Sequence, residues 1–326
     1  MNTMSATEQA PLDIAVGILV DNTGRLLIAR RRAGTPGEGL WEFPGGKREG
    51  DEPMADCLAR ELAEEIGVHD CRLDAPLIRF THHKGERPVR LHVWRIDQWQ
   101  GEPSGLEGQE LAWAERGALA DYRLLPATDV ILCALDLPAR YAITPALSAA
   151  DSQQWWARFE ALIARPDMPL LRLRDQGLDD AAYQALAAKV IEAAHAQGVA
   201  VLVDRSLSLC RAVGADGLHW PLARLIEAGR PALASGQRLA VSAHTGKDLA
   251  MAVERGADFA VLSPVAATPT HPGAKALGWD GWHAARADYG LPVYALGGLG
   301  EADLQNARQH NAQGVAAIRA FWPDVG

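Results

Sequence analysis

The sequence is poor in the features that mark secreted, membrane-spanning and disordered proteins. Its four cysteines, Cys57, Cys71, Cys133 and Cys210, have no CxxC or metal-ligand spacing, so we expect reduced thiols in a cytoplasmic protein. No apolar run approaches the roughly 20 residues that span a bilayer. The first residues lack a basic segment followed by an apolar one, so neither a signal peptide nor membrane binding is predicted.

Positive charge is also scarce in the first part of the chain. Residues 1–138 contain 15 Lys and Arg against 23 Asp and Glu, whereas the remainder contains 17 against 18. Because there is no basic stripe, binding to a nucleic acid polymer is not expected. A phosphorylated small molecule bound by the acidic part would need divalent cations as intermediaries.

The chain length of 326 residues suggests two domains. In the first part, residues 14–20 and 26–29 predict two strands, joined as a hairpin by a turn at 21–24. Segments 76–80 and 89–99 predict further strands, and segments 54–66 and 130–135 predict helices. We therefore expect an α+β sandwich over residues 1–138.

After Pro138, short apolar runs alternate with amphipathic helical segments, among them 179–197, 246–255 and 300–310. The eight strand candidates are residues 141–144, 170–174, 199–204, 217–220, 239–243, 259–263, 292–298 and 314–320. Eight strand–helix repeats predict a small (β/α)8 TIM barrel over residues 139–326, in which segment 220–238 forms the weakest repeat.

Three glutamates and an arginine lie close together in the predicted helix 54–66. Glu61, Glu64 and Glu65 follow Arg60, and at about 100° per residue their side chains fall within one sector of the helix. Clustered carboxylates repel one another, and hard cations prefer oxygen ligands. The pattern favours a site for Mg²⁺, or alternatively Mn²⁺, over a solvated charged helix face.

The loop before this helix brings two glycines, Gly45 and Gly46, next to the glutamates. Glycine lacks a Cβ, so backbone carbonyls of the loop can approach the same ion. Arg60 is placed to pair with Glu64 or with Glu52 of the loop. The complete pattern GX5EX7REUXEEXGU, in which U is aliphatic, is present over residues 46–68, and a chance match is on the order of 10⁻⁶.

This pattern is the Nudix box, and residues 13–135 resemble the MutT-type Nudix pyrophosphohydrolases. Further matching segments are IAVGIL at 14–19, ARRR at 29–32, LWEFPGGK at 40–47, WQGEPSGLEGQE at 99–110 and LPATDVI at 125–131. The resemblance implies catalytic roles for Arg60 and the three glutamates of the box. It also implies metal ligation by Glu61, Glu64, Glu65, Glu107 and the carbonyl of Gly45. Substrate would contact Arg31 and Arg87 through its phosphates, and Glu42, Phe43, Pro44 and Gly45 through the nucleotide.

The implied reaction is attack of water on a phosphorus atom of a nucleoside triphosphate, which releases pyrophosphate and a nucleoside monophosphate. Bound metal ions would lower the pKa of that water and neutralise charge. MutT-type enzymes that prefer 8-oxo-dGTP have an asparagine after Pro-Ala, whereas Thr128 stands here. A hydroxyl offers fewer separated donors and acceptors than an amide, so Thr128 is expected to contact the base and the preferred base stays open.

Residues 140–322 resemble thiamine phosphate synthase and its TenI relatives, which are phosphate-handling barrels. The matching segments are LRLRD at 171–175, VDR at 203–205, AVGADGLHW at 212–220, SAHT at 242–245, ATPTHPGAK at 267–275 and ALGGL at 295–299. These motifs fall at the carboxyl ends of the predicted strands, where barrel sites lie. The implied ligand site, which would take a phosphorylated molecule, consists of Arg174, Asp204, Ser242, Thr268, Thr270, Gly297 and Gly298.

Several positions depart from the synthase pattern. Gln176 and His271 replace lysines, and Leu222-Ala223-Arg224 replaces a Gln-Glu-Asp segment whose aspartate helps to bind Mg²⁺. Pro264 stands where TenI tautomerases have a histidine. Because each change removes a partner for a diphosphate or its metal, we expect neither activity in the form that the family performs.

Three hypotheses follow from the sequence. In the first, a metal-dependent pyrophosphohydrolase of the 8-oxo-dGTP diphosphatase type cleans the nucleotide pool and is joined to a degenerate barrel. In the second, the chain removes diphosphate from a thiamine-pathway compound that the barrel handles. In the third, the barrel is a non-catalytic sensor of a phosphorylated ligand.

Overall fold

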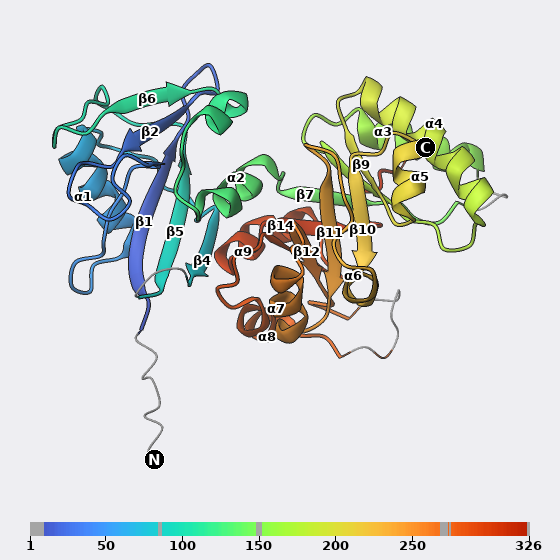
Figure 1. The fold of residues 1–326 in the computed structure, drawn as a ribbon. Helices are drawn as coiled ribbons and strands as arrows, with labels where there is room; N and C mark the ends of the chain where they lie inside the picture. Colours follow the sequence, from blue (N-terminus) through green and yellow to red (C-terminus); the bar gives the residue numbers. More distant parts are fainter. Residues whose placement is uncertain (1–9, 84–86, 148–151, 268–272, 274, 325–326) are drawn as a thin grey trace, which may run out of the picture. The chain divides into compact units, whose positions relative to one another are not determined.

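The computed structural model describes residues 10–83, 87–147, 152–267, 273 and 275–324. The chain divides into two compact units, Met1–Leu135 and Asp136–Gly326, called the N-terminal unit and the barrel unit below (Figure 1). In the described part of the chain the four cysteines form no disulfide with one another, in agreement with the expected reduced thiols. Among the described residues, no helix combines the length and apolar character that crossing a membrane requires.

The N-terminal unit contains two three-stranded sheets. One has the order β1-β5-β4, with β1 (Leu12–Leu19) parallel to β5 (Val89–Ile96) and β4 (Ile78–His82) antiparallel to β5. The other has the order β3-β2-β6 and is antiparallel, with β3 at Trp41–Glu42, β2 at Leu26–Arg30 and β6 at Leu111–Ala114. A 3-10 helix, η1 (Arg116–Asp121), and helix α2 (Thr128–Asp136) follow. The predicted α+β sandwich is confirmed.

The predicted hairpin of the first two strands is wrong. β1 and β2 share a single bridge, Val20↔Leu26, although Asp21 closes the turn between them by accepting hydrogen bonds from the backbone N–H groups of Thr23 and Arg25 at 2.9 Å each. All eight residues of β1 pair instead with β5. The other edge of β1, which a hairpin partner would need, is used by the loop of residues 44–46, because the N–H groups of Ala15 and Gly17 donate to the carbonyls of Gly46 and Pro44.

Helix α1 (Met54–Ile66) forms where the sequence predicts it. Its apolar stripe of Cys57, Leu58, Leu62 and Ile66 is fully buried against β1 and β5, and Gly67 ends the helix in the left-handed conformation at φ 69°. Only a residue that tolerates positive φ ends a helix in this way at low cost. The burial of this stripe leaves the glutamates on the remaining surface of the helix.

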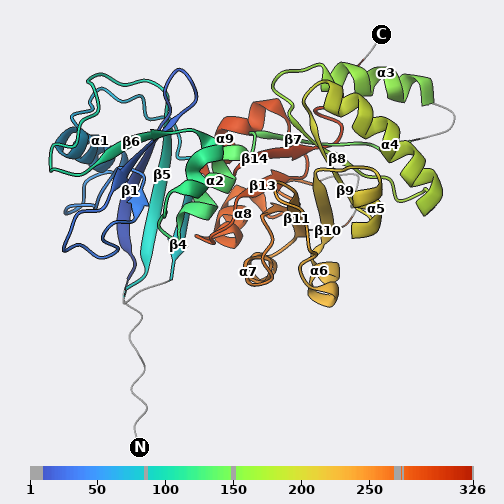
Figure 2. The same cartoon turned by 45° about the horizontal axis from the view of Figure 1, so that its top comes forward.

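The barrel unit is a closed ring of eight parallel strands, with helices on its outside (Figures 1 and 2). All eight predicted strands are present, so the predicted TIM barrel is confirmed. They are β7 Arg140–Ile143, β8 Leu170–Leu173, β9 Ala200–Val203, β10 Gly217–Pro221, β11 Arg238–Ala243, β12 Phe259–Leu262, β13 Val293–Leu296 and β14 Gly314–Ala317.

The connecting helices cover the outer face of the strands. They are α3 Ser152–Ile163, α4 Asp180–Ala196, α5 Leu207–Ala212, α6 Leu222–Ala228, α7 Gly246–Glu254, α8 Gly278–Arg286, η3 Glu301–Asp303 and α9 Leu304–Gln309. Inside the ring, Tyr141, Phe259 and Tyr294 contact one another with ring centroids 5.4–5.6 Å apart. Aromatic packing thus fills this part of the interior, so the barrel is no open pore.

Candidate active site

Arg60 is the centre of an ion-pair network on the exposed face of α1. Its guanidinium group pairs with Glu52 at 2.7 Å, with Glu61 at 3.0 Å and with Glu64 at 3.2 Å. It also donates to the carbonyl of Lys47 at 3.2 Å. The sequence predicts that Arg60 pairs with Glu64 or with Glu52 of the loop, and the structure contains both pairs, which tie the glycine loop to the helix.

The glycine loop is fixed on its other side by β1. The N–H of Gly17 donates to the carbonyl of Pro44 at 2.8 Å, and the N–H of Ala15 donates to that of Gly46 at 2.9 Å. Gly45 lies between them with φ 141°, a conformation that L-residues rarely adopt. A Cβ on Gly45 would overlap the backbone of Ala15, whereas one on Gly46 would overlap the carboxylate of Glu61. The backbone therefore requires glycine at position 45, whereas glycine at position 46 leaves room for the carboxylate of Glu61.

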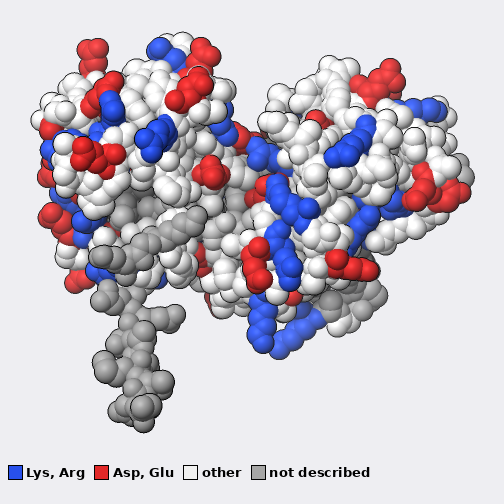
Figure 3. Space-filling model, in the orientation of Figure 1, with Lys and Arg blue, Asp and Glu red and all other residues white. Residues whose placement is uncertain are grey.

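A pocket of about 460 Å³ opens between this loop, α1 and the segment after β2. Its lining includes the carboxylates of Glu42, Glu49, Glu61, Glu65 and Glu107. It also includes the basic side chains of Arg30, Arg31, Arg32 and Lys47. On the face of this unit seen in Figure 3, acidic and basic side chains are interspersed with no continuous basic stripe. The chemistry suits a ligand that carries both phosphate groups and cations.

Electrostatic repulsion is concentrated at Glu65. Burial, together with the nearby carboxylates of Glu61, Glu107 and Glu42, raises the pKa of Glu65 to about 7, although the N–H of Gly45 donates to this carboxylate. Burial also raises the pKa of Glu61 and of Glu42. Burial is the main cause of all three shifts, and repulsion between carboxylates adds to it at Glu65 and Glu61.

The donor set of this pocket fits a hard divalent cation. Glu61, Glu65 and Glu107 supply carboxylate oxygens, which such cations prefer. The carbonyl of Gly45 accepts no hydrogen bond from the residues that the structure describes, unlike the carbonyls on either side of it. In the described part of the chain, however, no three His, Cys, Asp or Glu side chains are grouped closely enough to hold a metal ion as they stand. Arg60 accounts for part of this spacing because it attracts the carboxylates of both Glu61 and Glu64.

The structure does not bring all of the expected residues together. Glu64 is 60% exposed, pairs with Arg60 and does not line the pocket, so its role as a metal ligand stays a prediction. Phe43 is buried in the core between the sheets, and Pro44 is buried beside it. Arg87 donates to the carbonyl of Ala10 at 2.9 Å, and Thr128 is 3% exposed at the start of α2. None of these side chains lines the pocket.

Two arginines of the pocket are held by its own carboxylates. Nη1 of Arg31 lies 2.7 Å from both carboxylate oxygens of Glu42. Arg32, which the sequence analysis did not single out, pairs with Glu107 at 2.7 Å. The ARRR segment contains Arg32, but its partner lies 75 residues away, so no local pattern indicates the pairing.

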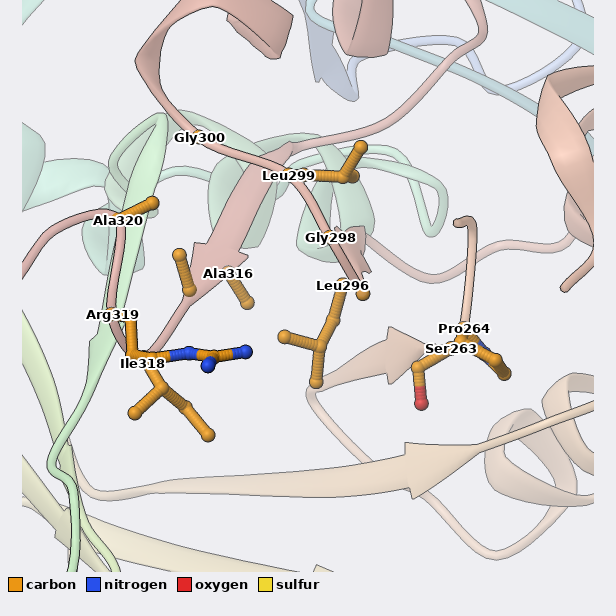
Figure 4. Close-up of a pocket in the computed structure, with 12 residues that line it drawn as sticks. Ser263, Pro264, Leu296, Gly298, Leu299, Gly300, Ala316, Ile318, Arg319 and Ala320 are labelled. Atoms are coloured by element: carbon orange, nitrogen blue, oxygen red, sulfur yellow. The ribbon is translucent and has the colours of Figure 1, made fainter. Parts of the chain in front are cut away.

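The barrel unit has a second pocket, of about 320 Å³, at the carboxyl ends of β13 and β14. Gly297, Gly298 and Gly300 line this pocket, and Arg319 extends into it toward Leu296 (Figure 4). Thr268 and Thr270 lie outside the described residues. This is the position at which barrels commonly bind phosphate, after strands seven and eight.

The other expected barrel residues are Arg174, Asp204 and Ser242, which follow or end neighbouring strands. Arg174 donates to Gln176 at 3.2 Å. Ser242 contacts Nε2 of His219 at 2.9 Å, and Nδ1 of His219 contacts the hydroxyl of Tyr141 at 2.8 Å. His219 is fully buried, and burial lowers its pKa well below its usual range. It is therefore a neutral, hydrogen-bonded group of the barrel interior.

Comparison with known families assigns each unit. The NUDIX domain family model matches residues 11–147, and the thiamine monophosphate synthase model matches residues 140–321. The chain therefore belongs to the Nudix family through its N-terminal unit and to the thiamine monophosphate synthase family through its barrel.

Individual relatives agree with this assignment. The 8-oxo-dGTP diphosphatase of Escherichia coli is 32% identical over 124 residues, which cover 38% of this chain and 95% of that protein. The CTP pyrophosphohydrolase of the same organism is 33% identical over 112 residues, covering 34% and 82%. A putative thiamine-phosphate synthase of Geobacter sulfurreducens is 34% identical over 161 residues, covering 47% and 73%.

Proposed function

We propose that the N-terminal unit is a Mg²⁺-dependent pyrophosphohydrolase that converts nucleoside triphosphates to monophosphates and pyrophosphate. The observation that carries this proposal is the single pocket in which Glu61, Glu65 and Glu107 face Arg31 and Arg32. Carboxylates supply ligands for the divalent ion, and arginines supply donors for the triphosphate.

Individual residues of the N-terminal unit have distinct roles in this proposed reaction. Bound divalent cations would lower the pKa of the attacking water and neutralise charge on the phosphate groups. Arg60 positions Glu61 by their ion pair, and the N–H of Gly45 positions Glu65. Arg31 pairs with Glu42 in the structure. When the substrate binds, one of its phosphate groups displaces Glu42 from Arg31 or binds Arg31 together with Glu42.

The base of the substrate is the least constrained part of this proposal. The two relatives from Escherichia coli are named for an oxidised purine and for a pyrimidine nucleotide, at similar identity to this chain. Thr128 is buried and does not line the pocket, so the hydroxyl expected to read the base is not presented there. We propose that the range of substrates includes both 8-oxo-dGTP and pyrimidine triphosphates, consistent with a role in cleaning the nucleotide pool.

The test is a substrate profile with the full chain, measured as pyrophosphate release from 8-oxo-dGTP, dGTP and CTP with Mg²⁺ or with EDTA. We expect pyrophosphate release in the presence of Mg²⁺ and none in the presence of EDTA. Glu65→Gln should lower kcat at least about a hundredfold, and the sequence pattern predicts a comparable loss for Glu64→Gln. Glu160→Gln, an exposed change on α3, is the matched control. Absence of turnover on all three nucleotides would refute the proposal.

For the barrel, we propose binding of a phosphorylated ligand in the pocket lined by Gly297, Gly298 and Arg319, without synthase activity. This rests on the pocket itself and on the replacement of a family lysine by Gln176. The alternative is a thiamine-pathway diphosphate hydrolase. A higher kcat/KM for hydroxymethylpyrimidine diphosphate than for 8-oxo-dGTP would favour that alternative, and no turnover of this diphosphate would exclude it.

A further inference from the structure

The carboxyl end of helix α1 is capped by a loop from far along the chain. The last carbonyls of an α-helix have no partner within the helix itself. The carbonyl of Glu65 accepts hydrogen bonds from the N–H of Leu106 at 2.9 Å and from Nε2 of Gln109 at 2.8 Å. The carbonyl of Ile66 accepts one from the N–H of Ser104 at 3.0 Å. The loop that follows β5 is therefore docked on the last turn of the helix.

The side-chain amide of Gln109 joins two of the candidate metal ligands through their backbones. Its Nε2 donates to the carbonyl of Glu65, and its Oε1 accepts a hydrogen bond from the N–H of Glu107 at 3.0 Å. An amide offers separate donor and acceptor groups, so one side chain makes both bonds. Neither bond uses a carboxylate oxygen. All three residues line the pocket of the N-terminal unit.

Arg32 holds Glu107 in a different way. It pairs with the carboxylate at 2.7 Å and donates to the carbonyl at 3.0 Å. A cation that takes the carboxylate of Glu107 must displace the ion pair with Arg32, whereas the bond from the backbone N–H of Glu107 to Gln109 is unaffected. The contact with Gln109 is thus a constraint on Glu107 that is compatible with metal binding.

This constraint matters more for Glu107 than for Glu65. Glu65 lies on a helix whose own hydrogen bonds fix its backbone. Glu107 lies on a loop, and its side chain is 41% exposed, so few packing contacts hold it. Ligands that are fixed before the ion arrives lose less conformational freedom when they bind it.

We propose that Gln109 is a positioning residue of the N-terminal unit, which fixes the backbone of Glu107 against that of Glu65 so that both carboxylates serve one divalent-cation site. The inference rests on the proposed function, because that function supplies the cation. Replacement of a residue that orients metal ligands typically lowers metal affinity about tenfold to a hundredfold. Gln109 acts through Glu107, so it should govern the affinity for the cation more than kcat at saturating cation.

Mn²⁺ binding to the full chain without nucleotide, followed by electron paramagnetic resonance, tests this inference. The wild type should bind Mn²⁺, and Glu107→Gln should bind it more weakly. Gln109→Met keeps the length of the side chain but loses both hydrogen bonds, so it should weaken binding about tenfold to a hundredfold. Gln98→Met, an exposed change just after β5, is the matched control and should leave the affinity unchanged.

A double variant and a milder variant distinguish positioning from a structural role. Because Gln109 acts through Glu107, Gln109→Met should add little to the loss caused by Glu107→Gln. Gln109→Asn keeps an amide but is one carbon shorter, so it can make at most one of the two bonds. It should fold, as shown by urea unfolding, and should weaken Mn²⁺ binding less than Gln109→Met does.

Pyrophosphate release separates this inference from the proposed function. Gln109→Met should raise the Mg²⁺ concentration for half-maximal rate by the same factor as it weakens Mn²⁺ binding, with kcat at saturating Mg²⁺ near that of the wild type. No Mn²⁺ binding by the wild type, unchanged affinity in both Gln109 variants or a fully additive loss in the double variant would overturn the inference. Turnover with an unchanged Mg²⁺ requirement would overturn the inference and leave the proposed function intact. Weakened Mn²⁺ binding in a chain that turns over none of the nucleotides would support the inference and refute the function.

Discussion

Adjacent glycines of the N-terminal loop provide a test that separates catalysis from stability. The Cβ of Gly46→Ala would overlap only the carboxylate of Glu61, the flexible end of a side chain, and the backbone at Gly46 does not require positive φ. The Cβ of Gly45→Ala would overlap the backbone of Ala15 and sit at φ 141°. One substitution displaces a carboxylate of the pocket, and the other displaces a core strand.

The expected magnitudes differ accordingly. In Gly46→Ala, Glu61 rotates away and loses its ion pair with Arg60, at about 0.5–1.5 kcal/mol. The lower entropy of the unfolded chain offsets about 0.4–1 kcal/mol of that, so the free energy of unfolding should change by less than about 1 kcal/mol. The kcat/KM should fall about a hundredfold, as for a reacting group misplaced by about 1 Å. Gly45→Ala should lower the free energy of unfolding by about 3 kcal/mol or more.

Urea unfolding and pyrophosphate release, measured on the same preparations, give both quantities. Because Gly46→Ala is expected to act through Glu61, the double variant with Glu61→Gln should be no slower than Glu61→Gln alone. A wild-type rate for Gly46→Ala would refute the placement of Glu61 in the catalytic pocket. A loss of stability in Gly46→Ala equal to that in Gly45→Ala would refute the loop geometry.

Three further predictions concern charge. Because burial lowers the pKa of His219, the unfolded form binds this proton first, so the contribution of His219 to stability should fall by about 1.4 kcal/mol per pH unit below about pH 6.5. His219→Gln should cost about 1–3 kcal/mol at neutral pH, and urea unfolding should show this deficit shrinking on acidification; a constant deficit would contradict the neutral assignment. Arg60→Met should lower the free energy of unfolding by about 1–3 kcal/mol through the loss of three ion pairs, with partial recovery in Arg60→Lys; an unchanged urea midpoint would contradict the network. Millimolar Mg²⁺ should raise the thermal unfolding temperature of the wild type and EDTA should reverse this; an equal rise in Glu65→Gln would argue against a site at that carboxylate.

Local periodicity accounts for what the sequence predicts well. Helix α1 buries a face that repeats within a few residues, as at Leu58 and Leu62. The barrel strands are short apolar runs that are buried along nearly their whole length, as in Leu170–Leu173. Such patterns depend on neighbours along the chain and need no knowledge of the fold. The same holds for the pairing of Arg60 with Glu64, which is one helical turn long.

The errors arise where a partner is distant in sequence. Nothing in residues 14–29 indicates that β1 pairs with β5 rather than with β2, because alternation identifies a strand and not its neighbour. The ion pair of Arg32 with Glu107 is likewise invisible to spacing. The role of Glu64 as a metal ligand stays a prediction, because its carboxylate pairs with Arg60 in the structure.

The two arginines Arg60 and Arg172 differ in how far neighbouring groups compensate their charge. Arg60 is partly exposed and has three carboxylates and a carbonyl within 3.2 Å, so its charge is already compensated and its role is to hold loop and helix together. Arg172 is more deeply buried, yet its Nε has no partner among the described residues and its ion pair spans 3.7 Å. Burial without compensation raises the free energy of the ligand-free protein.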